Sequence, residues 1–100
     1  MHVITRKRLK DFWEKHSLAQ PSLQLWYKIT SKANWQSFPQ LRQVFPSADL
    51  VGNSTVFNVG GNKYRLITLV DYKYQKVYIR YVLTHAEYDK EDWKQDSWYT

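Results

Sequence analysis

The chain has 100 residues, of which 43% are hydrophobic and 17% aromatic, which is enough for one hydrophobic core and excludes a disordered segment. It has no cysteine, which excludes disulfides, thiolate zinc sites and cysteine nucleophiles and suits a cytoplasmic protein. Fifteen Lys and Arg outweigh nine Asp and Glu, and the resulting net charge of +6 favours phosphate-rich partners.

The charges are distributed unevenly along the chain. Residues 1–86 contain thirteen basic and four acidic residues, whereas residues 87–100 contain two basic and five acidic residues. A basic body with an acidic tail is a candidate for binding nucleic acid, although many basic domains bind none. No apolar stretch is long, and residues 1–20 mix charges throughout, so we expect neither a signal peptide nor a membrane span.

The first part of the sequence predicts one short strand followed by two helices. Residues 2–5 form a short apolar stretch that is typical of a strand. From about Arg6 to His16, helical spacing then places on one face Leu9, Phe12, Trp13 and His16. Pro21 suits the first turn of a second helix, whose apolar spacing continues to Ala33. Two helices joined by a few residues should pack as an antiparallel hairpin.

The second part of the sequence changes to the alternation of β-strands. Residues 40–45, between two prolines, are a candidate short helix, and residues 51–53 are typical of a turn. Segments rich in β-branched and aromatic residues follow at 55–59, 63–70 and 76–83. Their short connections predict an antiparallel meander. The sequence therefore predicts a single α+β domain over residues 1–100, with its helices on one face of a small antiparallel sheet.

Alternation along the last two strands predicts which side chains share a face of the sheet. The face with fewer charges should take the helices, and it includes Val77, Ile79, Tyr81 and Leu83. The other face should display Lys63, Arg65, Tyr78 and Arg80. Cations interleaved with an aromatic ring suit a single-stranded nucleic acid, because phosphates bind the cations and bases stack on the ring. Any strand with one solvated face can also carry lysines and arginines, and for Lys63 and Lys76 that alternative stays open.

The two arginines are harder to explain by simple exposure. Arg65 and Arg80 each lie in the middle of a predicted strand between apolar neighbours. His85 is the histidine nearest to them, in the segment THAEYDK (84–90) that follows the last strand. An imidazole can move protons near neutral pH, as cleavage of RNA through its own 2′-hydroxyl requires. His85, the arginines and Tyr88 could perform that reaction without a metal, but composition alone favours His85 as a plain strand end.

Two charged clusters have simple alternatives. Arg6 and Arg8 lie in the first turn of the first predicted helix, where the helix dipole disfavours cations. A phosphate or an acidic partner would offset that cost, and a solvated surface would tolerate it. Glu87, Asp89 and their acidic neighbours lack a second ligand cluster for a metal, so we interpret them as solvated or as folded back on the basic body.

Three ordered segments resemble one known family. They are MHVITRKRLKDFWEKH at the start, FNVGGNKYRL (57–66) and YIRYVLTHAEYDK (78–90). Together they are similar to the HigB toxins, in the RelE-like superfamily of type II toxin–antitoxin systems, over nearly the whole chain. The resemblance implies two N-terminal helices over a small antiparallel sheet. It also implies a ribosome-dependent, metal-independent mRNA endonuclease that is inhibited by a HigA-like antitoxin with a helix-turn-helix.

The resemblance also implies roles for particular residues. RelE-like toxins bind mRNA in the ribosomal A site on the concave face of the sheet and cut it by 2′-hydroxyl attack. Arg65 occupies the place of an arginine that contacts the scissile phosphate, and Arg80 looks like a second phosphate contact. His85 is then the proton-transfer group, and Tyr88 is either the acid or a base-stacking residue. The further expected RNA contacts are Lys63, Tyr78, Lys90, Arg6 and Arg8. The alternative function is a module that binds RNA or the antitoxin without catalysis.

Overall fold

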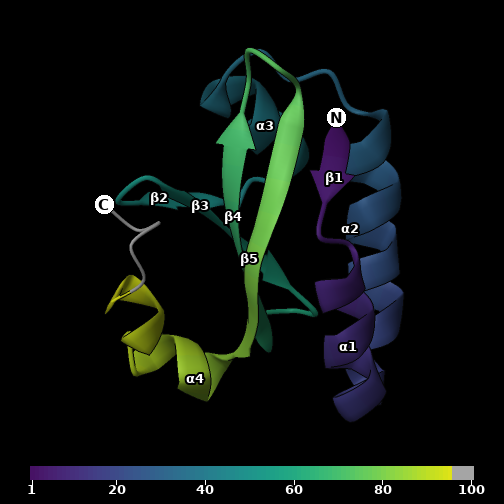
Figure 1. The fold of residues 1–100 in the computed structure, drawn as a ribbon, viewed down its shortest axis with the longest axis vertical. Helices are drawn as coiled ribbons and strands as arrows, with labels where there is room; N and C mark the ends of the chain where they lie inside the picture. Colours follow the sequence, from purple (N-terminus) through teal and green to yellow (C-terminus); the bar gives the residue numbers. More distant parts are fainter. Residues whose placement is uncertain (96–100) are drawn as a thin grey trace.

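The computed structural model describes residues 1–95, which form one five-stranded sheet with helices packed around it (Figure 1). The elements in chain order are β1 (His2–Ile4), α1 (Lys7–Lys15), the 3₁₀ helix η1 (Ser17–Ala19), α2 (Gln20–Lys32), α3 (Phe38–Val44), β2 (Asp49–Val51), β3 (Ser54–Val59), β4 (Tyr64–Asp71), β5 (Lys76–Thr84), α4 (His85–Asp89) and the 3₁₀ helix η2 (Asp92–Gln95). The predicted α+β class is confirmed. Within residues 1–95, no helix has the length and apolar character needed to cross a membrane.

α1 and α2 form the predicted hairpin and lie together on one side of the sheet, whereas α4 lies apart from them (Figure 1). α2 carries Pro21 in its first turn, where the missing N–H costs no helical hydrogen bond. α3 begins earlier than predicted, because the hydroxyl of Ser37 accepts a hydrogen bond from the Gln40 N–H at 3.4 Å and Pro39 fits the first turn.

The sheet has the order β1–β5–β4–β3–β2, and its centre is the predicted antiparallel meander of β3, β4 and β5. β1 pairs in parallel with the first part of β5, with Val3 opposite Val77, so the whole sheet is mixed. β2 lies where the sequence predicted only irregular structure and a turn, and it places Leu50 opposite Thr55. Gly52, with φ +61°, makes the tight turn that allows this pairing.

A β-bulge interrupts β5. Ile79 is opposite Thr68 on β4, but Tyr81 is opposite the adjacent Ile67, which leaves Arg80 as an extra residue. An extra residue on one strand of an antiparallel pair bends that strand and resets its alternation.

The bulge corrects the predicted assignment of side chains to faces. Beyond it, Val82 packs with the core on the helix side, whereas Tyr81 and Leu83 pack on the opposite side. The prediction that Tyr81 and Leu83 face the helices is therefore wrong, because one inserted residue inverts the alternation for the rest of the strand.

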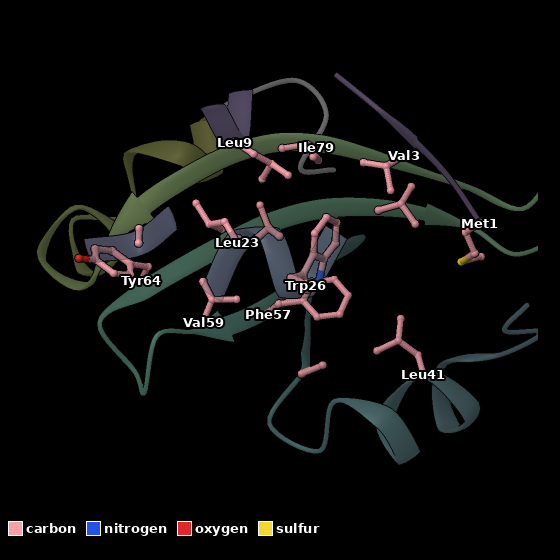
Figure 2. Close-up of a cluster of buried hydrophobic side chains, with 14 of the residues drawn as sticks. Met1, Val3, Leu9, Leu23, Trp26, Leu41, Phe57, Val59, Tyr64 and Ile79 are labelled. Carbon is pink, nitrogen blue, oxygen red and sulfur yellow. The ribbon is translucent and has the colours of Figure 1, made fainter. Parts of the chain in front are cut away.

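The main core lies between the helical hairpin and the side of the sheet called here the helix face (Figure 2). Its fully buried side chains include Leu9, Leu23, Trp26, Phe57, Leu66 and Ile79. The rings of Trp26 and Phe57 meet edge to face with their centroids 5.4 Å apart.

The opposite side of the sheet, called here the open face, carries a second and smaller cluster. Val56 and Ile67 are paired neighbours on β3 and β4, and Trp93 of η2 covers them. Partly buried side chains of the open face complete the cluster, namely Val51, Tyr81, Leu83 and Tyr88. Because α4 and η2 pack here, away from α1 and α2, this cluster positions the segment that follows β5 (Figure 1).

Candidate functional site

Arg65 lies on the open face, and Tyr88 of α4 packs against it. The Arg65 Cζ atom is 5.5 Å from the centre of the Tyr88 ring. The Arg65 Nη1 donates hydrogen bonds to the backbone carbonyls of Asn62 at 2.9 Å and Tyr64 at 3.3 Å. These two hydrogen bonds hold the guanidinium in place at the end of the half-buried Arg65 side chain. A planar guanidinium held in this way suits a phosphate, which can accept two parallel hydrogen bonds.

Tyr88 is held between Arg65 and Trp93. The rings of Tyr88 and Trp93 stack with their centroids 5.4 Å apart and their planes 16° from parallel. The indole N–H of Trp93 donates to the Tyr88 carbonyl at 3.3 Å, and only 5% of Trp93 is exposed. Burial raises the pKa of the Tyr88 phenol above its ordinary value, although the nearby charges of Lys94 and Arg65 lower it. The phenol is therefore protonated at neutral pH and can donate a proton.

α4 begins where β5 ends, and a capping box fixes the junction. The Glu87 N–H donates to Thr84 Oγ1 at 3.2 Å, and the Thr84 N–H donates to the Glu87 carboxylate at 2.9 Å. The His85 N–H donates to the Lys63 carbonyl at 3.1 Å, which ties the start of α4 to the turn before β4. These hydrogen bonds position His85 and Tyr88 on a helix of only five residues.

His85 has a side-chain partner on its own helix. Its Nδ1 atom is 2.9 Å from Oδ2 of Asp89, and the two side chains are 53% and 60% exposed. Neighbouring carboxylates also have local partners, because Glu87 caps the helix and Glu91 accepts a hydrogen bond from Lys94 at 2.8 Å. The acidic segment is thus exposed to solvent but structured by specific contacts.

Arg80 sits at the β-bulge. Ile79 faces the main core, so alternation places Arg80, the next residue, on the open face. Its Nε atom is buried, and its carbonyl accepts a hydrogen bond from the guanidinium of Arg8 in α1. Arg80 thus shares a face with Arg65, and the bulge is tied to the first turn of α1.

Two of the residues predicted to contact RNA, Lys63 and Lys90, lie near the two ends of α4. Lys63 is exposed in the turn whose carbonyl holds His85, and Lys90 is exposed at the end of α4. Tyr78 shares the open face, but it lies six residues before Thr84, or about 20 Å along the strand. The structure therefore places Lys63 beside the start of α4 and Lys90 just after its end, and it keeps Tyr78 at the far end of the strand.

Arg6 and Arg8 diverge, although they are two residues apart. The Arg6 Cζ atom is 4.3 Å from the centre of the Tyr27 ring in α2, so Arg6 packs on the helical hairpin. Arg8 reaches the edge of β5 instead. The sequence cluster is not one cationic patch, because successive helical residues point in different directions.

Two hollows adjoin beside α4. One of about 310 Å³ lies between α1 and the edge of β5, and one of about 380 Å³ lies between β5 and the α4–η2 segment. Tyr81 and Glu87 line both of them. Tyr81, which alternation predicted to face the helices, is therefore a partly buried residue of the open face that lines both hollows.

Sequence reasoning missed three residues of this site, namely Tyr81, Asp89 and Trp93. The spacing of four between His85 and Asp89 was a usable signal, because such residues are neighbours on a helix. No local pattern indicated the bulge that turns Tyr81 to the open face, or the packing of Trp93 against the sheet.

Comparison with known proteins identifies relatives along most of the chain. The HigB toxin family model, described as the RelE-like toxic component of a toxin–antitoxin system, matches residues 19–91. The mRNA interferase toxin HigB of Escherichia coli strain K12 is 41% identical over 92 residues, which cover 89% of this chain and 88% of that protein. The mRNA interferase HigB of Shigella flexneri matches equally well, and that of Escherichia coli O6:H1 is 25% identical over 93 residues, or 90% of each chain.

Proposed function

Because the chain belongs to the HigB family of RelE-like toxins, the toxic components of toxin–antitoxin systems, we propose that it is an endoribonuclease that cleaves mRNA. The observation that carries the proposal is the grouping on the open face, where Arg65 packs on Tyr88 at 5.5 Å and His85 lies one turn earlier on α4. A guanidinium that binds the phosphate, a protonated phenol and an imidazole can together cleave RNA without a metal.

The proposed reaction transfers the phosphate linkage to the neighbouring 2′-oxygen. His85 takes the proton of the 2′-hydroxyl while its oxygen forms a bond to phosphorus. Arg65 and Arg80 hold the non-bridging oxygens as negative charge builds on them. The bond from phosphorus to the 5′-oxygen then breaks, and the Tyr88 phenol protonates that oxygen. The products are a 2′,3′-cyclic phosphate and a 5′-hydroxyl, and solvent returns His85 and Tyr88 to their starting protonation states.

We propose further that the substrate is mRNA in the ribosomal A site and that a HigA-like helix-turn-helix antitoxin is the inhibitor. The family resemblance supports both assignments. The charge supports the first, because residues 1–86 carry an excess of nine positive charges and a ribosome presents a large polyanionic surface. The cytoplasm is the compartment where such a substrate is found.

Induction of the toxin with and without its antitoxin tests the proposal. Wild-type protein should arrest growth and leave transcripts that end in a 2′,3′-cyclic phosphate or 3′-phosphate. His85→Gln and Arg65→Ala should each lower cleavage by roughly 10²-fold or more while remaining folded. Lys28→Ala, on the exposed side of α2, is the matched control and should cleave normally.

Two outcomes would contradict the proposal. Undiminished arrest in both the His85 and the Arg65 variants would remove the assigned roles. Arrest without cleaved transcripts would favour the alternative, a non-catalytic module that binds RNA or the antitoxin. Purified translation reactions with and without ribosomes would then test the ribosome dependence separately.

A further inference from the structure

The pair of His85 and Asp89 is oriented against the arrangement that stabilises helices. His85 is the first residue of α4 and Asp89 is the last. A carboxylate at the C-terminus opposes the helix dipole, and an i,i+4 pair stabilises a helix better when the acidic residue comes first. Helix stability therefore does not explain why these two side chains meet at 2.9 Å.

We propose that Asp89 is a positioning residue, which holds the imidazole proton of His85 on Nδ1 and so leaves the lone pair of Nε2 for the 2′-hydroxyl proton. This inference rests on the proposed function. An ionised carboxylate only accepts hydrogen bonds, so the ring nitrogen that it binds must carry a proton. The other ring nitrogen is then the acceptor. An unconstrained neutral imidazole in water mostly carries its proton on Nε2, which is the wrong form for this role.

Asp89 is the carboxylate that contacts the imidazole of His85, and the two nearest glutamates have other partners. Within residues 1–95, Glu87 is bonded to the Thr84 N–H and Glu91 to Lys94. The His85 backbone is held separately by the Lys63 carbonyl, so the side-chain contact is free to fix the ring rather than the helix start.

The carboxylate also compensates the positive charge that forms on His85 when it accepts the proton. In a buried triad this arrangement has a large effect on rate. Here 60% of Asp89 and 53% of His85 are exposed, so water screens the interaction and a smaller effect is expected.

Asp89→Asn is the sharpest variant. The amide has nearly the same shape, but it can turn its NH₂ group toward Nδ1 and stabilise the Nε2–H form. We expect kcat for cleavage of ribosome-bound mRNA to fall about tenfold, with KM changed by less than about twofold. Glu91→Gln is the control, because it removes the same charge two residues away and its side chain contacts Lys94 rather than His85. It should leave kcat unchanged.

Nitrogen NMR of the imidazole gives a readout that needs no catalysis. At about pH 8.5, above the ordinary pKa of an imidazole, wild-type His85 should show the Nδ1–H form. Asp89→Asn and Asp89→Ala should shift it toward the Nε2–H form, and Glu91→Gln should not. His85→Gln identifies the signals of His85 among those of the three histidines.

The outcomes separate this inference from the proposed function. An Nε2–H form in the wild type, or an unchanged ring in Asp89→Ala, would overturn the role of Asp89. Loss of cleavage in His85→Gln together with normal cleavage in Asp89→Asn would also overturn that role and leave the proposed function standing. Normal cleavage in His85→Gln would overturn the role of His85 as the base and with it the role of Asp89, but not the cleavage of mRNA itself.

Discussion

The central strands β3, β4 and β5 contribute to both faces of the sheet, but different elements cover the two faces. On β3, Phe57 points to the helix face and Val56, its neighbour, points to the open face. α1 and α2 cover the helix face with long apolar stripes, whereas the open face is covered by the short α4–η2 segment around Trp93.

Because of this difference, the helix face mainly stabilises the fold and the open face mainly positions the residues of the candidate site. Within residues 1–95, the helix face holds the largest of the fully buried side chains, Trp26 and Phe57, so it dominates the free energy of unfolding. The open face buries few residues, but it holds Tyr88 against Arg65 and anchors His85. A small cluster with few buried contacts can open without global unfolding. Substitutions on the two faces should therefore have different consequences.

The largest expected effect is that of Phe57→Ala on the helix face. Phe57 is 0% exposed and packs on Trp26 and Phe45, so its removal leaves a cavity in the main core. We expect the free energy of unfolding to fall by about 3–5 kcal/mol in denaturant titration. A loss below about 1 kcal/mol would show that the helix face is not the main source of stability.

Trp93→Ala should have the largest effect on the open face. It removes the ring under Tyr88 and the hydrogen bond to the Tyr88 carbonyl. We expect the free energy of unfolding to fall by about 2–3 kcal/mol, less than for a tryptophan in the main core. The variant should also lose most of its mRNA cleavage. Hydrogen exchange should accelerate in α4 and much less in β3 and β4. Equal acceleration in α4 and the strands would contradict the separation of the two faces.

Thr84→Ala should have an intermediate effect, because it removes the side-chain half of the capping box. The expected cost is about 1 kcal/mol of stability, concentrated in α4. Thr84→Ser keeps the hydroxyl and is the matched control. If both variants exchanged their α4 amides at the wild-type rate, the cap would not hold the helix on the sheet.

The smallest effect should be a dependence on alkaline pH. Burial raises the pKa of Tyr88 on the open face and of Tyr72 beside the main core. A raised phenol pKa means that the contribution to stability is complete below the ordinary pKa of about 10 and is lost as the pH rises above it. Tyr88→Phe should remove part of this loss in denaturant titrations at increasing pH. An unchanged profile would show that Tyr88 does not titrate with unfolding.

Much of the architecture could be predicted, because it follows from patterns between near neighbours in the chain. The spacing of Leu9 and Phe12 predicted a helix, and the alternation around Arg65 predicted a strand of the meander. The same alternation placed Arg65 on the open face, as the structure has it. The catalytic roles of His85 and Arg65 remain predictions.

The errors arose where the pattern depends on a distant contact. Arg80 is inserted as a bulge only because β4 pairs on both sides of it, and that insertion moves Tyr81 from the helix face to the open face. β1 pairs in parallel with β5, although more than seventy residues separate the paired positions in the chain. No local pattern predicts such a pairing.

The sequence by itself determined the helical hairpin, the central strands and the family of this protein, because side-chain periodicity and ordered motifs are properties of the chain itself. Only the tertiary structure decided that Arg6 and Arg8 contact different elements, that Trp93 packs on Tyr88, and that Asp89 contacts His85. These outcomes depend on which surfaces pack together, and packing is a balance among contacts between residues that the chain does not place side by side.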